Sequence, residues 1–98
     1  MSHTHAMRTW SAIDREYPFQ LAIPEDDNFR QNFWDISAAA KLGCAYRMFG
    51  QLEKSGRFYA LILFARPEIR DILKRQFGGE PLTPIDIERG GWRRVVAI

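Results

Sequence analysis

Cysteine is scarce in this chain, since Cys44 is the single one among 98 residues. One cysteine cannot form an internal disulfide, so the small secreted domains that depend on several disulfides are excluded. Long apolar runs are missing too. No stretch approaches the roughly 20 apolar residues that span a bilayer, and the opening MSHTHAMRTW lacks the apolar segment of a signal peptide. These absences predict a cytoplasmic protein that does not act at a membrane.

Histidine is almost as rare, because the chain has only His3 and His5, both near its start. A metal site needs further ligands, and the sequence places none beside this pair. A nucleophilic Cys44 would need a neighbouring base, and the acidic run at 25–27 lacks the spacing of a calcium loop. No Ser-His-Asp pattern, phosphate-binding glycine loop or pair of catalytic carboxylates can be assembled. We therefore expect no enzyme, no metal site and no cofactor.

Neither sign of charge dominates, since 14 basic and 12 acidic residues leave a net charge of +2. That value is too small to indicate nucleic-acid binding by itself. The apolar fraction of 46% is typical of a globular chain, and a chain of this length supports one hydrophobic core. We expect a flexible tail at residues 1–7 and a single domain at residues 8–98.

The spacing of apolar residues in the first half predicts helix, strand and helix. Trp10, Ile13 and Tyr17 recur at helical intervals before Pro18, which ends a short helix. The apolar segment 19–23 is a strand candidate. Acidic residues then stand where a helix would begin, and Gly43 stands where it would end. The apolar stripe of this second helix consists of Phe29, Phe33, Ile36 and Ala40.

The second half predicts a hairpin, a helix and two short strands. Lys54-Ser55-Gly56 suits a turn between strands at 44–51 and 57–64. Pro67 begins the clearest helix of the chain, and Gly78-Gly79 ends it. The segment TPIDIERGGWRRVVAI alternates apolar and polar residues, so we expect two short strands around Gly90-Gly91.

This order of elements predicts an α+β domain of the ferredoxin-like type, βαββαβ. Such a domain has a four-stranded antiparallel sheet with both helices on one face. The short helix before the first strand is an addition, and an extra strand at the C-terminus is left open. The other face of the sheet is expected to be uncovered.

The strand RFYALILF, residues 57–64, is apolar on both sides and raises the question of what covers the second side. Phe58, Ala60, Ile62 and Phe64 form one row and are assigned to the helix-covered core. Tyr59, Leu61 and Leu63 form the other row. Leaving such side chains in water forgoes about 1.5–3 kcal/mol each, so we expect something to cover them.

The same strand resembles the third-strand signature of RNA-recognition-motif domains, which begins with a basic residue and presents aromatic side chains. Arg57, Tyr59, Ala60, Ile62 and Phe64 match this signature, whereas Phe58 and Leu61 depart from it. The resemblance implies that Tyr59 stacks on a base and that Arg57 contacts a phosphate.

Three interpretations of the uncovered face remain open. The helix near Trp10 or the C-terminal segment WRRVVAI could fold across it as a second small core. A protein partner or a second copy of the chain could bind it, as apolar surfaces rimmed by charge do. Single-stranded nucleic acid could stack on its aromatic residues. Trp92, with Arg89 before it and Arg93 and Arg94 after it, is a further contact candidate under either binding interpretation.

We therefore expect a non-enzymatic binding module, such as an adaptor, a regulatory subunit or an inhibitor. A protein partner or a homodimer is favoured, through the open face or the basic C-terminal hairpin, and RNA or single-stranded DNA is the alternative. The residues expected to contact a protein are Tyr59, Leu61, Leu63, Trp92 and Arg94. Those expected to contact nucleic acid are Arg57, Tyr59, Tyr46, Arg47, Phe49, Arg93 and Arg94.

Overall fold

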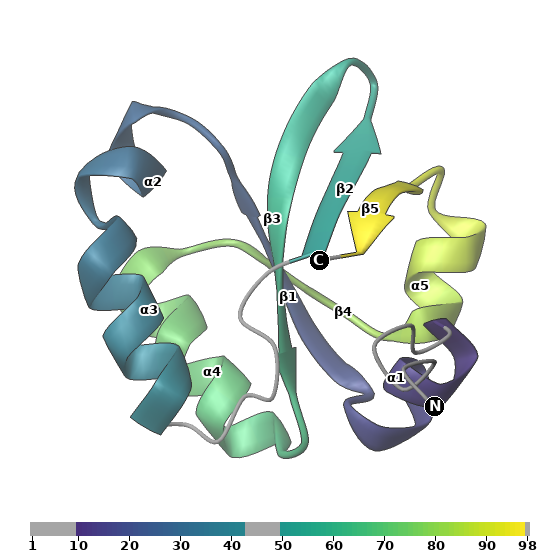
Figure 1. The fold of residues 1–98 in the computed structure, drawn as a ribbon, viewed down its shortest axis with the longest axis horizontal. Helices are drawn as coiled ribbons and strands as arrows, with labels where there is room; N and C mark the ends of the chain where they lie inside the picture. Colours follow the sequence, from purple (N-terminus) through teal and green to yellow (C-terminus); the bar gives the residue numbers. More distant parts are fainter. Residues whose placement is uncertain (1–9, 43–49, 98) are drawn as a thin grey trace, which may run out of the picture.

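An antiparallel sheet of five strands forms the middle of the molecule, with helices on both of its faces (Figure 1). The computed structural model describes residues 10–42 and 50–97. The strands follow the order β4-β1-β3-β2-β5 across the sheet. Their bounds are β1 (Phe19–Pro24), β2 (Gly50–Lys54), β3 (Arg57–Phe64), β4 (Glu80–Leu82) and β5 (Arg93–Ala97).

Strand β3 is the centre of the sheet and pairs with β1 on one side and β2 on the other. The loop between β2 and β3 consists of Ser55 and Gly56, whose φ angles are +54° and +81°. Two successive positive φ angles define the hairpin turn whose twist matches that of the strands. The turn expected at Lys54-Ser55-Gly56 is therefore present, with Lys54 as the last residue of β2.

Five helices lie within the described residues. They are α1 (Trp10–Glu16), α2 (Asp27–Gln31), α3 (Phe33–Leu42), α4 (Pro67–Phe77) and α5 (Pro84–Arg89). The carboxylate of Asp26 begins α2 by accepting a hydrogen bond from the Phe29 N–H at 2.9 Å. None of these helices is long and apolar enough to cross a membrane.

Helices α2, α3 and α4 cover the first face of the sheet, on the left in Figure 1. Their buried side chains meet the row of β3 that begins at Phe58, as the alternation of the strand predicts. This core consists of Leu21, Ile23, Phe29, Ile36, Ala60, Ile62, Phe64 and Leu73. Phe58 itself is 46% exposed, because it lies at the beginning of β3.

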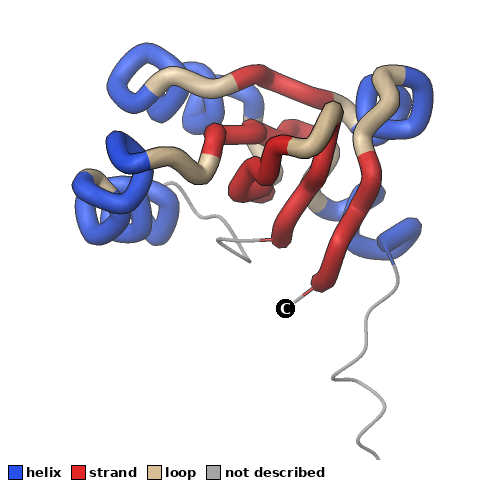
Figure 2. Tube along the Cα trace, turned by 90° about the horizontal axis from the view of Figure 1, so that it is seen from above, coloured by secondary structure: helices blue, strands red, loops and turns tan. Residues whose placement is uncertain are grey.

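Helices α1 and α5 cover the second face, on the right in Figure 1, and Figure 2 shows helices on either side of the strands from above. This second core consists of Ile13, Tyr17, Ala22, Leu52, Leu61, Leu63, Leu82, Ile87 and Trp92. The expectation of an uncovered sheet face is thus wrong, whereas the first of the three interpretations, in which the helix near Trp10 packs across this face as a second core, is what the structure shows. The sheet is apolar on both sides because helices pack on both sides.

Three other sequence-based expectations also need correction. The sheet has five strands, and the C-terminal strand that was left open is present as β5. Helices pack on both faces, so the four-stranded, two-layer ferredoxin-like arrangement is not confirmed. The segment PIDIER is helix α5 and not a strand. The single helix expected before Gly43 is divided at Asn32 into α2 and α3. Gly43 lies outside the described residues.

Candidate functional site

The row Tyr59, Leu61 and Leu63 lies inside the second core. Leu61 and Leu63 are 0% and 1% exposed. Tyr59 is half-buried, and its ring meets the ring of Trp92 edge-on, with the ring centroids 4.9 Å apart. These side chains stabilise the domain by apolar burial. Of the three, Tyr59 alone is not fully buried.

Trp92 contacts several side chains on the face of the sheet that α1 and α5 cover. It precedes β5, is 9% exposed and packs against Tyr59. The ammonium group of Lys54 lies 4.7 Å from the centroid of a Trp92 ring, within the range of a cation–π contact. Trp92 and Tyr59 are separate contact candidates in the sequence, and the structure brings the two together.

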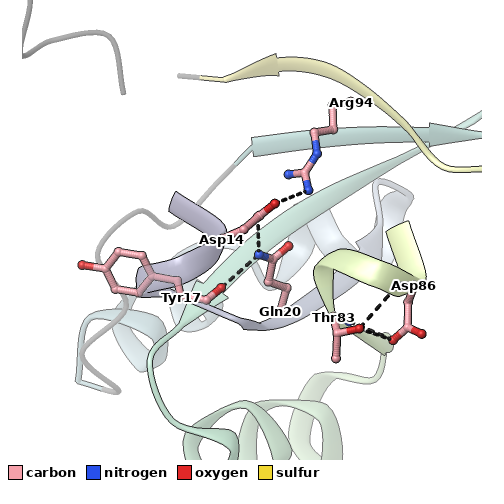
Figure 3. A network of polar contacts seen from close by, with 6 residues as sticks. All are labelled: Asp14, Tyr17, Gln20, Thr83, Asp86 and Arg94. Carbon is pink, nitrogen blue, oxygen red and sulfur yellow. Dashed lines mark hydrogen bonds and ion pairs between the residues drawn. The ribbon is translucent and has the colours of Figure 1, made fainter. Parts of the chain in front are cut away.

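Arg94 holds α1 against the sheet. Its guanidinium donates a hydrogen bond to the Asp14 carboxylate at 2.9 Å (Figure 3). The same guanidinium lies 4.2 Å from the Trp10 ring centroid. The other oxygen of Asp14 accepts a hydrogen bond from the side-chain amide of Gln20 at 3.0 Å, and the same amide donates to the Tyr17 carbonyl at 2.9 Å. These bonds connect strands β1 and β5 to α1. Arg94 therefore has a structural role, whether or not it also contacts a partner.

Two surface depressions lie beside α5 and share Trp92 as a lining residue. The first has a volume of about 360 Å³ and is lined by Lys54, Glu80, Pro81, Leu82, Asp86, Arg89, Gly90 and Trp92. The second has a volume of about 300 Å³ and is lined by Asp14, Pro84, Ile87, Glu88, Trp92 and Arg94. We call these two depressions, together with the exposed Ile85 of α5, the α5 surface.

The folding of α5 follows from a local capping signal in the sequence, the pair Thr83 and Asp86. Thr83 and Asp86 form a reciprocal cap: the Asp86 N–H donates to the Thr83 hydroxyl, and the Thr83 N–H donates to the Asp86 carboxylate at 2.9 Å (Figure 3). Pro84 occupies the first turn, where its missing N–H costs nothing. This cap begins α5, whose Ile87 packs in the second core while Ile85 and Arg89 are exposed.

The residues expected to contact nucleic acid are only partly brought together. Arg57 is exposed at the beginning of β3. Arg93 is exposed and paired with Glu53, its Nε lying 2.9 Å from a carboxylate oxygen. Tyr46, Arg47 and Phe49 lie outside the described residues, and so does Cys44.

The contacts of Glu53 lower the pKa of its carboxyl group. The Gly56 N–H, which donates to the carboxylate at 2.9 Å, and the Arg93 guanidinium both lower the pKa of Glu53. Its stabilising contribution is therefore complete above the ordinary glutamate pKa and is lost as the pH falls through the lowered folded-state pKa. We expect an NMR titration to show this lowered pKa, and Arg93→Gln to raise it part of the way. An ordinary pKa for Glu53 in the wild-type protein would contradict these contacts.

The described residues contain no cluster of three or more histidine, cysteine, aspartate or glutamate side chains placed to hold a metal ion. The candidate site is therefore defined by the shape of the two depressions beside α5 and by the charged side chains that line them. No protein-family model matches this chain, and neither a curated protein nor a solved structure matches it.

Proposed function

We propose that this protein is a non-enzymatic binding module that contacts a protein partner through the α5 surface. The observation that carries the proposal is the arrangement around Trp92, which lines two depressions that are each also lined by residues of the short helix α5. An adaptor, a regulatory subunit and an inhibitor all act through such a contact. A second copy of the chain is one of the partners that the proposal includes.

The composition of the α5 surface favours a protein over a small molecule. Both depressions are open to solvent, and Ile85, on the helix that contributes residues to both linings, is 59% exposed. Protein interfaces combine an apolar centre with a charged rim, and their binding energy concentrates on tryptophan, tyrosine and arginine. Trp92 lines both depressions, Arg89 lines the first and Arg94 lines the second.

Site-specific photo-crosslinking tests this proposal with a matched control. Ile85 on α5 and Ile72 on α4 are both exposed isoleucines, at 59% and 46%, and they lie on helices that cover opposite faces of the sheet. We expect a photoreactive amino acid at position 85 to crosslink a protein from source-cell extract, in competition with unlabelled wild-type protein. The same group at position 72 should not do so.

A product at twice the 11.4 kDa mass of the chain would identify the partner as a second copy. Equal crosslinking from positions 85 and 72, or none from either, would contradict the proposed surface.

Binding of RNA or single-stranded DNA is a second candidate, and the beginning of β3 favours it. Phe58 is 46% exposed and follows the exposed Arg57, so an aromatic ring and a cation are available to a base and a phosphate. We expect a labelled mixed-sequence oligonucleotide to bind at low salt and to dissociate as salt rises. Phe58→Ala should weaken this binding by about 1–3 kcal/mol. No binding at high micromolar protein would exclude this candidate.

A further inference from the structure

We propose that the second depression beside α5 binds a cationic side chain, lysine or arginine, of a peptide segment in the partner, an inference that rests on the proposed function. Two carboxylates line this depression, Asp14 from α1 and Glu88 from α5, against one cation, Arg94 from β5. The lining therefore carries an excess of one negative charge. Complementary charges across an interface favour the matching partner and disfavour a partner of the same sign.

The first depression does not share this imbalance. Its lining holds the cations Lys54 and Arg89 against the carboxylates Glu80 and Asp86, so its charges cancel. The two linings together contain four carboxylates and three cations, although the whole chain has a net charge of +2. The excess negative charge of the α5 surface therefore lies in the second depression.

Glu88 is the carboxylate of the second depression that is available to a ligand. Asp14 and Arg94 are paired with each other at 2.9 Å. Glu88 is exposed, and within residues 10–42 and 50–97 it forms no ion pair. It also lies in the last turn of α5, where the helix dipole disfavours a negative charge. The stability of the helix therefore does not account for this glutamate.

Apolar groups around Glu88 suit the rest of a cationic side chain and its neighbour in a peptide. Pro84, Ile87 and Trp92 line the same depression. Lysine and arginine bury their aliphatic stems along such groups while the charged end stays with a carboxylate. Ile85, which is 59% exposed, stands three residues before Glu88 and so lies on the same side of the helix. A volume of about 300 Å³ is at the small end of the range for ligand sites and suits one side chain.

Two tryptophans of the chain allow a direct test by NMR, because each reports on a different place. Trp92 lines the second depression, and Trp34 is 80% exposed on α3, on the opposite face of the sheet. The probe is the blocked peptide acetyl-Leu-Lys-Leu-amide at millimolar concentration, added to the ¹⁵N-labelled full chain. We expect the indole N–H signal of Trp92 to shift with saturation, and that of Trp34 to stay in place. No shift of Trp92, or an equal shift of both signals, would overturn the inference.

Three further probes separate the chemistry of the ligand. The norleucine and glutamate versions of the peptide keep both leucines but remove or reverse the charge, and n-butylammonium supplies the cation without a peptide. We expect none of the three to shift Trp92 as the lysine peptide does. An equal shift with the norleucine or the glutamate peptide would overturn the assignment to a cation, and an equal shift with n-butylammonium would overturn the assignment to a peptide.

Charge reversal distinguishes the two depressions, which is necessary because Trp92 lines both. We expect Glu88→Lys to weaken binding of the lysine peptide by about tenfold, because an attractive contact becomes repulsive. The matched control is Glu80→Lys, which makes the same change at an exposed residue of the first depression and should bind as the wild type does. Unchanged binding by the Glu88→Lys protein, with a wild-type Trp34 signal as the sign of correct folding, or equal losses in the two variants, would overturn the inference.

This result is distinguishable from a failure of the proposed function. If crosslinking from position 85 captures a partner and the Glu88→Lys variant captures it equally well, the α5 surface binds a partner and the site for a cationic side chain is wrong. If position 85 captures nothing, the proposed function itself fails.

Discussion

Leu61→Asp is expected to unfold the domain. Leu61 is 0% exposed and lies in the core beneath α1 and α5, so an aspartate there would be buried without a partner and would leave the volume of the leucine unfilled. The combined cost is about 5 kcal/mol or more, which is comparable to the whole stability of a small domain, about 5–15 kcal/mol. Circular dichroism and urea denaturation would show the loss of the folded state.

The control for this substitution is Ile85→Asp, which introduces the same charge on the outer side of α5. Ile85 is 59% exposed and stands in the first turn of that helix, where an acidic residue is favourable. Its denaturation midpoint should therefore stay close to that of the wild type. A folded Leu61→Asp protein of wild-type stability would mean that the second face of the sheet is open to solvent.

Gly79→Ala is expected to destabilise the domain by about 2–4 kcal/mol, through backbone strain and crowding together. The φ angle of Gly79 is +106°, and a Cβ atom added there would lie 2.9 Å from the Ala22 carbonyl oxygen and 3.0 Å from a side-chain carbon of Ile23. Both contacts are with β1, against which β4 pairs directly after this glycine. Thermal or urea denaturation measures the loss.

The matched control is Gly56→Ala in the β2–β3 turn. Gly56 also has a positive φ angle, +81°, but nothing lies within 4 Å of a Cβ added to it. Its substitution should lower the stability of the domain by about 1–2 kcal/mol, which is the cost of placing alanine in the left-handed backbone conformation. Equal losses for the two variants would show that β1 does not approach Gly79 as closely as the structure has it.

The parts of the fold that the sequence predicts well are those with long or strongly marked patterns. The helix 67–77 has an apolar stripe, a proline at its start and glycines at its end, and it is present as α4. The strand 57–64 and its turn are present because an eight-residue apolar run and a Ser-Gly turn leave few alternatives. Trp10 and Ile13 correctly indicate the short helix α1.

The segment PIDIER was misassigned because six residues cannot separate the two periodicities. Ile85 and Ile87 alternate as in a strand, but in a helix residues two apart also point to different sides. The structure shows this difference, since Ile85 is 59% exposed and Ile87 is 3% exposed. The spacing of Thr83 and Asp86 was the better signal, because the reciprocal cap that they form occurs at the beginning of a helix and not in a strand.

The coverage of the second face depends on tertiary packing, which local patterns do not contain. A helix as short as α1 is marginal alone and forms because Ile13 and Tyr17 pack on the sheet. The Asp14–Arg94 pair that ties it down joins residues 80 positions apart, so no spacing rule could have found it. The same holds for the first depression, whose lining comes from β2, β4 and α5.

The most direct test of this account is a methyl NOE measurement between the helices and the sheet on the second face. Ile13 of α1 and Ile87 of α5 share one core with Leu52, Leu61 and Leu63. We predict cross-peaks from both isoleucine methyl groups to leucine methyl groups of this set. A well-dispersed spectrum in which neither isoleucine contacts any of these leucines would contradict the two-sided packing on which the α5 surface depends.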